Sequence, residues 1–500
     1  MFKKILVANR GEIACRVLQA AREMNIPTLA VYSEADQNAL HVLKADEAAL
    51  LGPPAPGESY LNIDKIIEVA KEHGADAIHP GYGFLSENHR FAKRCEDEGI
   101  TFIGSHSESI RSMGNKIEAR QMMIESGVPV IPGMSGSASD VDLFKSEADK
   151  VGYPVLLKAA AGGGGKGMRV VHDPDNIEDA LNGAMREAKS AFGDDSVYLE
   201  KYIEEPRHVE FQIMADKHGN CVYLFERECS IQRRHQKIIE ETPSVAVDDE
   251  LRRKMGEAAV RVAKACEYSN AGTVEFLLDK KKNFYFLEMN TRIQVEHPVT
   301  EMVVGVDLVK EQIRVASGEK LSFSQEELFQ HGHAIECRIY AEDAENNFLP
   351  SSGKLLFYKE PQGPFIRVDS GVYSGVDITV FYDPILAKLI VWGERRNEAV
   401  ERMKQALDDY IVLGVKTSIH YLKAILEHPE FISGKTFTDF IPRNMSEWEP
   451  PVVSEDQIKV ALLSAVIHEM KKKPAVTEGG KEEMPSPWNS IGKWEIGMGG

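Results

Sequence analysis

Five polar side chains alternate with less polar ones between residues 288 and 296. These positions carry two carboxylates, two amides and a guanidinium: Glu288, Asn290, Arg292, Gln294 and Glu296. Because successive side chains of an extended strand point to opposite faces, the five groups are expected to share one face. Carboxylates hold cations and accept protons, and a guanidinium binds oxyanions. An aromatic-rich run at residues 284–287 precedes the row. An ordinary half-buried strand is therefore the weaker interpretation, and we predict the floor of a reaction site.

A further carboxylate, Glu275, is predicted to face this row. Residues 273–278 and 283–289 flank residues 279–282, which are typical of a hairpin tip. Centring the turn between Lys281 and Lys282 pairs 275 with 288, 277 with 286 and 279 with 284. Like charges directly opposite each other destabilise a strand pair. A cation between Glu275 and Glu288 would remove that penalty.

Two interpretations of this carboxylate pair remain open. Magnesium takes carboxylate oxygens together with nucleotide phosphates, which favours a metal site. The alternative is two solvated glutamates on an exposed strand. Three aromatic residues of the hairpin, Phe276, Phe284 and Phe286, indicate a core strand pair, so we favour the metal site.

A glycine-rich loop occupies residues 162–167, with the sequence Gly-Gly-Gly-Gly-Lys-Gly. Apolar runs at 154–160 and 168–171 flank it, so the loop is expected to join two strands. A dinucleotide fingerprint requires a strand and then a helix, and a P-loop requires lysine where Met168 stands. Glycine N–H groups can wrap phosphate oxygens without obstruction. With Lys158 upstream, we predict a phosphate-covering lid; the alternative is a flexible surface hairpin.

Two further segments carry functional residue types. Residues 230–237 place four basic side chains within five positions, either as an anion site or as a solvated basic loop. Residues 79–88, His-Pro-Gly-Tyr-Gly-Phe-Leu-Ser-Glu-Asn, follow a strand and open a helix. That is the ligand side of an open α/β sheet. The alternative is a tight turn with Ser86 as the helix N-cap.

Alternating strands (4–8, 28–32, 75–79) and helices (12–24, 62–73, 87–98) predict an N-terminal parallel α/β unit. Residues 206–330 are predicted to be antiparallel, with strands at 207–215, 221–228, 272–278 and 283–291 around a helix at 250–267. Residues 331–447 mix strands, the first at 333–340, with a helix at 395–410. Pro450-Pro451 opens a linker, and residues 456–472 are predicted to form an amphipathic helix.

The composition limits the classes of function. The chain has 500 residues, 43% hydrophobic and 27% charged, typical of a soluble globular enzyme. A formal net charge of -19 gives no support to nucleic-acid binding. Six scattered cysteines form no CxxC pair, which argues against a zinc site or a disulfide framework and favours a reducing compartment. The short apolar N-terminus and the absence of a long apolar run predict a cytoplasmic protein without membrane association.

Together these motifs resemble the biotin carboxylases, the ATP-grasp component of biotin-dependent carboxylases. The resemblance extends from residue 2 to about residue 446 and rests on the opening residues 5–14, the 79–88 block, the glycine loop, residues 229–237 and residues 288–298. It implies a fold of class α/β and α+β, with an ATP-grasp core. The implied domains are an N-terminal α/β domain (1–114), an ATP-grasp domain (115–330) with a lid at about 132–204, a C-terminal domain (331–447) and a tail (448–500).

The resemblance also implies roles for individual residues. Nucleotide contacts fall on Lys116, Lys158, Gly164, Gly165, Glu200, Lys201, Ile203, His208, Gln232, His235, Leu277 and Leu287. Metal ligands for Mg²⁺ or Mn²⁺ fall on Glu275, Glu288 and Asn290. Bicarbonate contacts fall on Lys237, Arg292, Gln294 and Val295. Glu296 matches the catalytic base, and Arg338 matches the residue that steadies the biotin enolate.

The implied reaction makes carboxyphosphate from ATP and bicarbonate and then carboxylates biotin. The chain has no lysine between two methionines, the biotin attachment motif; Met470-Lys471 lacks the second methionine. Biotin is therefore expected on a carrier protein. No carboxyltransferase length is present either, so a separate carboxyltransferase subunit is expected, and the resemblance implies a homodimer. The final acceptor, whether pyruvate, acetyl-CoA or propionyl-CoA, stays open. The competing hypotheses are another ATP-grasp ligase and a nucleotide-binding protein without turnover.

Overall fold

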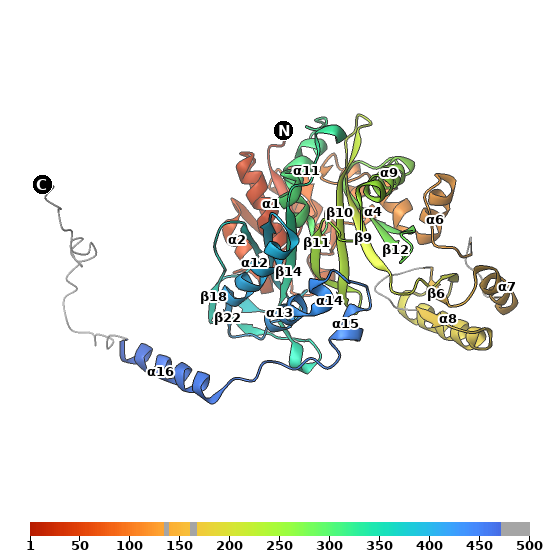
Figure 1. Ribbon diagram of the computed structural model, residues 1–500. Helices are drawn as coiled ribbons and strands as arrows, with labels where there is room; N and C mark the ends of the chain where they lie inside the picture. Colours follow the sequence, from red (N-terminus) through yellow and green to blue (C-terminus); the bar gives the residue numbers. More distant parts are fainter. Residues whose placement is uncertain (135–139, 161–167, 472–500) are drawn as a thin grey trace, which may run out of the picture. The chain divides into compact units, whose positions relative to one another are not determined.

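The computed structural model describes residues 1–134, 140–160 and 168–471 (Figure 1). The chain divides into two units, residues 1–449 and residues 450–500. The predicted glycine lid, with Gly164 and Gly165, lies outside the described residues.

The first unit begins with a five-stranded parallel sheet in the order β3–β2–β1–β4–β5. Its strands are β1 (Ile5–Val7), β2 (Thr28–Ser33), β3 (Glu47–Gly52), β4 (Ala77–His79) and β5 (Thr101–Phe102), and its helices are α1 (Gly11–Glu23), α2 (Leu40–Lys44), α3 (Ile63–Glu72), α4 (His89–Asp97) and α5 (Ser107–Gly114). The parallel α/β prediction is confirmed. Strand β3 was missed because its Glu-Ala-Ala-Leu-Leu-Gly sequence favours helix by propensity.

The helix after the 79–88 block begins later than we predicted. Asn88, not Ser86, is the N-cap of α4, and its side chain accepts hydrogen bonds from the amides of Arg90 and Phe91. Ser86 is buried, and its hydroxyl has no partner among the described residues. The Ser86 N-cap of the alternative interpretation is therefore wrong.

An eight-stranded antiparallel sheet, in the order β13–β12–β9–β10–β11–β14–β21–β19, forms the centre of this unit. The strands are β9 (Arg207–Ala215), β10 (Cys221–Arg233), β11 (Gln236–Thr242), β12 (Asn270–Leu278), β13 (Phe284–Asn290), β14 (His333–Tyr340), β19 (Ile366–Ser370) and β21 (Ile385–Gly393). The associated helices are α9 (Asp249–Ala265), α10 (His297–Val304), α11 (Leu308–Ala316) and α12 (Arg396–Asp409). The sheet is continuous on both sides of residue 330, because β11 pairs with β14.

A small three-stranded sheet, β7–β6–β8, carries the ends of the glycine loop (Figure 1). Its strands are β6 (Val155–Ala159), β7 (Arg169–Val171) and β8 (Val197–Lys201), covered by α7 (Val141–Val151) and α8 (Ile177–Phe192). Helix α6 (Lys116–Glu125) precedes it in the chain. Strands β6 and β7 pair antiparallel, so the loop does join two strands, as predicted.

The remaining elements are short. Three two-stranded sheets pair β15 (Glu342–Asp343) with β16 (Leu349–Pro350), β17 (Gly353–Lys354) with β20 (Asp377–Ile378), and β18 (Phe357–Lys359) with β22 (Ile411–Leu413). Helices α13 (Ile419–Glu427), α14 (Pro429–Ile432) and α15 (Phe440–Asn444) follow, and the second unit contains α16 (Glu455–Lys471). Among the described helices, none has the length and apolar character needed to cross a membrane.

Candidate active site

The β12–β13 hairpin carries the predicted carboxylate pair. Glu275 pairs with Glu288, as predicted, but Leu277 pairs with Tyr285 instead of Phe286. The predicted 279–284 pairing is also wrong, because the Asp279 amide bonds to the Asn283 carbonyl. The turn is centred on Lys281, half a residue earlier than we expected. An irregularity in the pairing between Glu275 and Phe276 then brings Glu275 opposite Glu288, as predicted. Leu287 is the extra residue of this β-bulge.

The bulge changes which side chains face the core. Phe286 packs in the core beside Phe276, whereas Leu287 and Glu288 both line a cavity and Met289 returns to the core. A β-bulge places two residues of one strand opposite one of its partner and re-aims the next side chains. Strict alternation would have left Glu288 on the same face as Phe284 and Phe286. The bulge is what places Glu288 in the cavity.

The alternating strand predicted over 288–296 ends early. Strand β13 ends at Asn290, and Arg292 to Val295 follow in an irregular connection. Glu296 is the residue before α10. The connection nevertheless returns its polar groups to the same cavity, so the five predicted residues share a site without sharing a strand face.

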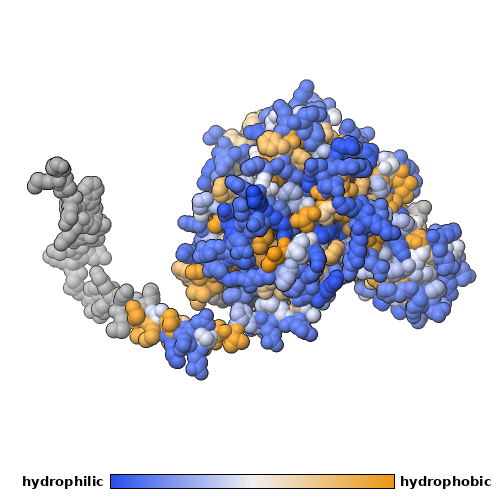
Figure 2. Space-filling model, in the orientation of Figure 1, coloured by the Kyte–Doolittle hydropathy of each residue, from blue (hydrophilic) through white to orange (hydrophobic). Residues whose placement is uncertain are grey.

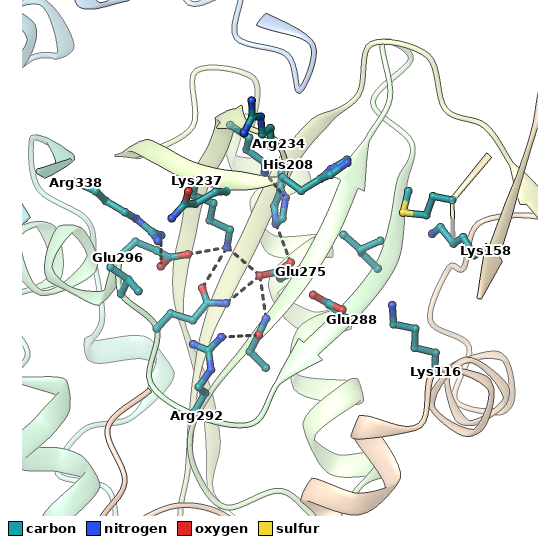
Figure 3. A pocket seen from close by; sticks show the side chains of 18 of the residues that line it. Lys116, Lys158, His208, Arg234, Lys237, Glu275, Glu288, Arg292, Glu296 and Arg338 are labelled. Atoms are coloured by element: carbon teal, nitrogen blue, oxygen red, sulfur yellow. Dashed lines mark hydrogen bonds and ion pairs between the residues drawn. The ribbon is translucent and has the colours of Figure 1, made fainter. Parts of the chain in front are cut away.

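The cavity has a volume of about 550 Å³ (Figure 3). Arg338 and Glu296 lie at one end, Lys116 and Lys158 at the other, and the carboxylates between them. Its lining includes fifteen of the predicted site residues: Lys116, Lys158, His208, Gln232, His235, Lys237, Glu275, Leu287, Glu288, Asn290, Arg292, Gln294, Val295, Glu296 and Arg338. Arg234, a basic residue of the predicted 230–237 anion site, also lines the cavity, as do Ala159, Met168 and Gln236, which were not predicted.

Lys237 is the central cation of the site (Figure 3). Its ammonium group lies 2.9 Å from Glu275 Oε1, 2.6 Å from Glu296 Oε1 and 2.5 Å from Glu210 Oε2. Burial opposes the ionisation of these carboxyl groups, but the charge of Lys237 holds the pKa of Glu275 and of Glu296 well below the usual range. The same ion pairs raise the pKa of Lys237, again against the effect of burial. Both carboxylates are therefore ionised and able to hold a cation or accept a proton.

Arg338 connects Glu296 to a further buried carboxyl group. It donates to Glu296 Oε2 over 3.0 Å and to Glu240 Oε1 over 2.6 Å. Burial, opposed by Arg338, raises the pKa of Glu240 to about 7. The guanidinium thus lies between one fully ionised carboxylate and one that titrates near neutrality.

The three residues of the metal-ligand prediction lie together in the cavity. Asn290 Nδ2 donates to Glu275 Oε1 over 2.9 Å, and Asn290 Oδ1 accepts from Arg292 over 3.1 Å, so the amide would have to turn to offer its oxygen to a cation. Burial and the charge of Glu275 raise the pKa of Glu288, which a cation between them would reverse. His208, Glu210 and Glu275 also place ligand atoms within 4.8 Å of one another. Lys237 already supplies positive charge to that second group, and Mg²⁺ prefers oxygen donors. The carboxylate–amide set therefore fits Mg²⁺ or Mn²⁺ better.

His208 belongs to the same network through its two ring nitrogens. Gln232 Nε2 donates to His208 Nδ1 over 2.9 Å and to the Cys229 carbonyl over 2.8 Å. The other ring nitrogen, Nε2, lies 3.0 Å from Glu275 Oε2, but the geometry makes no hydrogen bond between them. His208 is thus held by Gln232 beside the Glu275 carboxylate.

The end of the cavity that carries Lys116 and Lys158 is basic. Lys158 Nζ lies 2.6 Å from Glu200 Oε2, and Lys116 forms no ion pair within the described part of the chain. The Lys201 ammonium donates to the carbonyls of residues 152 and 153. Glu200, Lys201, Ile203 and Leu277 are not lining residues of the cavity, so the structure brings together only part of the predicted nucleotide set.

The four basic side chains of residues 230–237 separate from one another. Arg233 pairs with Glu342 over 2.6 Å and stacks on Phe348. Arg234 and His235, the positive-φ residues of the β10–β11 turn, line the cavity together with Lys237. The predicted anion site thus receives three of the four, and Arg233 has a structural contact.

Sequence reasoning missed several polar residues around Lys237. Glu210 is fully buried and pairs with Arg227 over 2.6 Å. Glu87, from the 79–88 block, accepts from the Thr291 amide over 3.0 Å and from Arg292 Nε over 2.8 Å. The available signal was the alternation His208, Glu210, Gln212 along β9, which matches the polar row that we noticed in β13.

A second cavity, of about 600 Å³, adjoins the first. The two share Gln236, Arg292, Val295 and Arg338. Aromatic residues line its other side, including Tyr82, Phe84 and Tyr382. An apolar chamber therefore opens beside the Arg338 end of the polar cavity.

Comparisons with known proteins agree with this geometry. The chain matches three family models in succession: "Biotin carboxylase, N-terminal domain" over residues 1–110, "Carbamoyl-phosphate synthase L chain, ATP binding domain" over 115–324 and "Biotin carboxylase C-terminal domain" over 336–443. A pyruvate carboxylase subunit of Methanothermobacter thermautotrophicus is 54% identical over 480 residues, 95% of this chain and 98% of that one. Biotin carboxylase 1 of Bacillus subtilis is 52% identical over 442 residues, 88% of this chain and 98% of that one.

A solved structure gives the same result. The biotin carboxylase domain dimer of Hydrogenobacter thermophilus 2-oxoglutarate carboxylase, solved with MgADP, ADP and bicarbonate, matches with a TM-score of 0.86 and 49% identity. The match covers 90% of this chain and all of that one.

The fold and the carboxylate- and lysine-lined cavity define an ATP-grasp enzyme. The chain belongs to the biotin carboxylase family, whose members use ATP, Mg²⁺ and bicarbonate to carboxylate biotin within multi-subunit carboxylases. The predicted fold class, enzyme class and cofactors are confirmed.

Proposed function

We propose that the cavity around Lys237 makes carboxyphosphate from ATP and bicarbonate and then carboxylates biotin delivered by another polypeptide. One observation carries this proposal. Lys237 contacts both Glu275, at the metal end, and Glu296, which is joined to Arg338 at the other end. One polar array therefore extends from the phosphate-binding lysines to the groups proposed for biotin.

The metal and nucleotide roles follow the oxygen and lysine positions. Glu275 and Glu288, with Asn290, would hold Mg²⁺ or Mn²⁺, which offsets the charge of the transferring phosphoryl group when bound. Lys116 is a half-buried cation without an ion pair in the described residues, so it is available to a phosphate. Lys158 would exchange its contact with Glu200 for phosphate oxygens. The remaining residues that were predicted to contact the nucleotide, together with the glycine lid, are also proposed to bind ATP.

Bicarbonate is proposed to bind between Arg292 and Lys237, beside Gln294 and Val295. Three contacts fix the Arg292 guanidinium: Glu87 Oε2, the Ile293 carbonyl and Asn290 Oδ1. A fixed planar fork suits a planar oxyanion. Gln294 donates to Glu275 over 2.9 Å, which connects the bicarbonate and metal ends.

Glu296 is proposed as the proton acceptor. Its pKa is low because burial is outweighed by Lys237 and Arg338, so it is a weak base in the resting protein. An anion that draws Lys237 away would raise the basicity of Glu296 when the base is needed. Carboxyphosphate then releases carbon dioxide and phosphate. Glu296 or that phosphate takes the ureido proton of biotin, while Arg338 stabilises the enolate oxygen.

Biotin on its carrier is proposed to enter through the second cavity. That chamber shares Arg338 with the polar cavity and presents Tyr82, Phe84 and Tyr382, which suits an apolar ring and arm. The partners would be a biotin carboxyl carrier protein and a carboxyltransferase subunit, with this chain as a homodimer in the cytoplasm. The final acceptor belongs to the carboxyltransferase.

The test is ADP release with Mg²⁺, bicarbonate and free biotin. Dependence on bicarbonate is expected, and its absence would exclude the proposal. Glu296→Ala should lower biotin carboxylation by at least about 100-fold, as is typical for loss of a general base, with MgADP binding retained. Wild-type turnover in Glu296→Ala would contradict the assigned base. ADP release that needs another carboxylate in place of bicarbonate would instead favour a different ATP-grasp ligase.

The tail is proposed to dock the partner protein. Large apolar side chains cover more than half of the circumference of α16: Ile458, Val460, Leu462, Leu463, Val466 and Ile467 are all exposed (Figure 2). An apolar face of a helix is normally buried against another element or a partner. The Bacillus subtilis biotin carboxylase matches 442 residues of this chain, and the pyruvate carboxylase relative matches 480. The extra length therefore accompanies the relative that is named as part of a larger carboxylase.

Substitutions in the full chain would test the tail. Leu462→Glu with Leu463→Glu should abolish co-purification with a biotinylated partner but leave carboxylation of free biotin unchanged. Ser464→Glu, a polar position of the same helix, is the control. Retained co-purification in the double variant would exclude docking through α16, and a change in activity with free biotin would indicate packing on the chain itself.

A further inference from the structure

The connection from Arg292 to Glu296 has no regular secondary structure, yet it carries most of the proposed anion site. Three of its carbonyl groups are held by side chains. Arg292 Nη1 donates to the Ile293 carbonyl over 3.1 Å, His297 Nδ1 to the Gln294 carbonyl over 2.7 Å and Lys388 Nζ to the Val295 carbonyl over 2.9 Å. The last two donors are fully buried and do not line the cavity. We call His297 and Lys388 together the carbonyl clamp.

His297 acts on this connection as a neutral donor. It is fully buried, and burial together with Lys388, Arg16 and Arg367 holds its pKa well below the usual range. A neutral imidazole has one N–H group, and the Gln294 carbonyl can only accept. The proton therefore lies on Nδ1. Within the described residues Nε2 has no hydrogen-bond partner, so the ring makes one polar side-chain contact.

The carbonyl clamp also fixes the direction of two main-chain N–H groups, those of Val295 and Glu296. In a planar trans peptide the N–H points opposite to the C=O. The clamped Gln294 carbonyl therefore directs the Val295 N–H away from His297, and the clamped Val295 carbonyl directs the Glu296 N–H away from Lys388. Neither amide has an acceptor in the described part of the chain. Val295 and Glu296 both line the polar cavity, and successive main-chain N–H groups form sites for anions.

We propose that His297, with Lys388, is a positioning residue for the bicarbonate step, because it fixes the peptide whose Val295 N–H binds the anion. This inference rests on the proposed function. His297 touches neither substrate nor nucleotide and acts only through the Gln294 carbonyl. The His297 main-chain N–H also donates to the Gln294 carbonyl, over 3.3 Å, so loss of the imidazole leaves that carbonyl with only the longer bond and loosens the peptide.

His297 is the better position for a test. Lys388 also lies 3.3 Å from Glu12 and 3.6 Å from Asp369, so its removal leaves buried carboxylates without a partner. His297→Leu removes a neutral donor at similar volume. His297→Asn keeps it, because the Asn Nδ2 and the imidazole Nδ1 are the same number of bonds from the backbone. His297→Gln places the donor one bond further out.

Steady-state ADP release gives the KM values for bicarbonate and for MgATP. His297→Leu should raise the bicarbonate KM about tenfold, the order expected when a buried carbonyl loses a short hydrogen bond. The KM for MgATP should stay within about twofold, and His297→Asn should restore the wild-type bicarbonate KM. A structural role alone would change both KM values together with the melting temperature.

The KM values of these variants can overturn the inference. An unchanged bicarbonate KM in folded His297→Leu, or a His297→Asn variant no better than His297→Leu, would overturn the inference. If His297→Leu does not fold, the pair His297→Asn and His297→Gln replaces it, and equal bicarbonate KM values in that pair would overturn the inference. Failure of the proposed function is distinct, because wild-type enzyme would then show no bicarbonate-dependent ADP release.

Discussion

Replacing Lys237 by methionine should destabilise the protein by an amount that the site geometry bounds. Glu210 would keep Arg227 at 2.6 Å, and Glu296 would keep Arg338 at 3.0 Å. Glu275 would keep only His208 and two side-chain amides, with no lysine or arginine of the described residues beside it. One buried carboxylate is therefore left without a cation, and breaking one buried ion pair costs about 3–5 kcal/mol. If Glu210, Glu275 and Glu296 each lost their only cation, the destabilisation would exceed that range.

The pH dependence of this loss follows from the pKa shifts. In the wild type Lys237 holds the pKa of Glu275 and Glu296 low against the effect of burial. Their stabilisation is therefore present above the unfolded pKa of about 4.3 and is lost as the pH falls through the folded pKa. In Lys237→Met, burial without the cation raises the pKa of Glu275, so the folded variant gains stability as the pH falls. The difference between the two proteins should shrink from about pH 7.5 to about pH 5.5.

Urea denaturation at the two pH values measures this difference. Lys254→Met is a matched control, because Lys254 makes an exposed pair with Glu250 over 2.6 Å and should cost at most about 1 kcal/mol. Glu275→Gln added to Lys237→Met should recover about 2 kcal/mol or more, since it removes the unpaired carboxylate. A loss below about 1 kcal/mol, a difference that widens at low pH, or no recovery in the double variant would refute the reasoning.

Three further predictions concern neighbouring groups. At Glu241 the effect of burial is outweighed by His333 and Arg396, which hold the pKa of this carboxyl group at about 2. By linkage, Glu241→Gln should destabilise the protein by about 3 kcal/mol at about pH 7. Urea denaturation should show that this loss is unchanged down to about pH 5 and declines below it. Glu240 has a pKa raised to about 7, so its stabilisation is present below the unfolded pKa of about 4.3 and is lost as the pH rises through the folded pKa. Glu240→Gln should therefore gain stability relative to the wild type between about pH 4.5 and 7 and keep a constant advantage above that range, and equal pH profiles would contradict the shift. Arg292→Lys removes the planar guanidinium that three contacts hold in place, and it should reduce kcat/KM for bicarbonate by roughly 10–100-fold. The affinity for MgADP, measured by calorimetry, should be unchanged. Parallel losses in both quantities would argue against a bicarbonate contact.

The sequence predicted most of the strands, because their patterns are local. Strand β14 matches its predicted range at both ends, and α16 differs by one residue. Strand β3 was missed because its Ala-Leu sequence follows helix propensity, and only pairing with β2 makes it a strand.

The candidate site was predictable to the extent that its residues lie in recognisable motifs. Spacing found Glu275 and Glu288, and the resemblance supplied Lys237 and Arg338. Glu210 and Arg227 were not predicted: the alternation of polar residues along β9 was available as a signal, but it does not say which strands lie beside β9. Their relation to Lys237 arises from the pairing of β9, β10 and β12, which no local pattern encodes.

The bulge at Leu287 has a consequence for how this chain can vary. Side-chain orientation along β13 behaves like a reading frame, and the extra residue shifts that frame between Phe286 and Glu288. Substitution of Leu287 keeps the frame. Deletion of Leu287 would remove the extra residue, and Phe286 opposite Phe276 and Glu288 opposite Glu275 would then follow in regular alternation on their present faces. Deletion of Met289 would instead turn Asn290 toward the core. The loss of a residue is therefore tolerated at position 287 and excluded two positions away, although Leu287 makes no polar contact of its own.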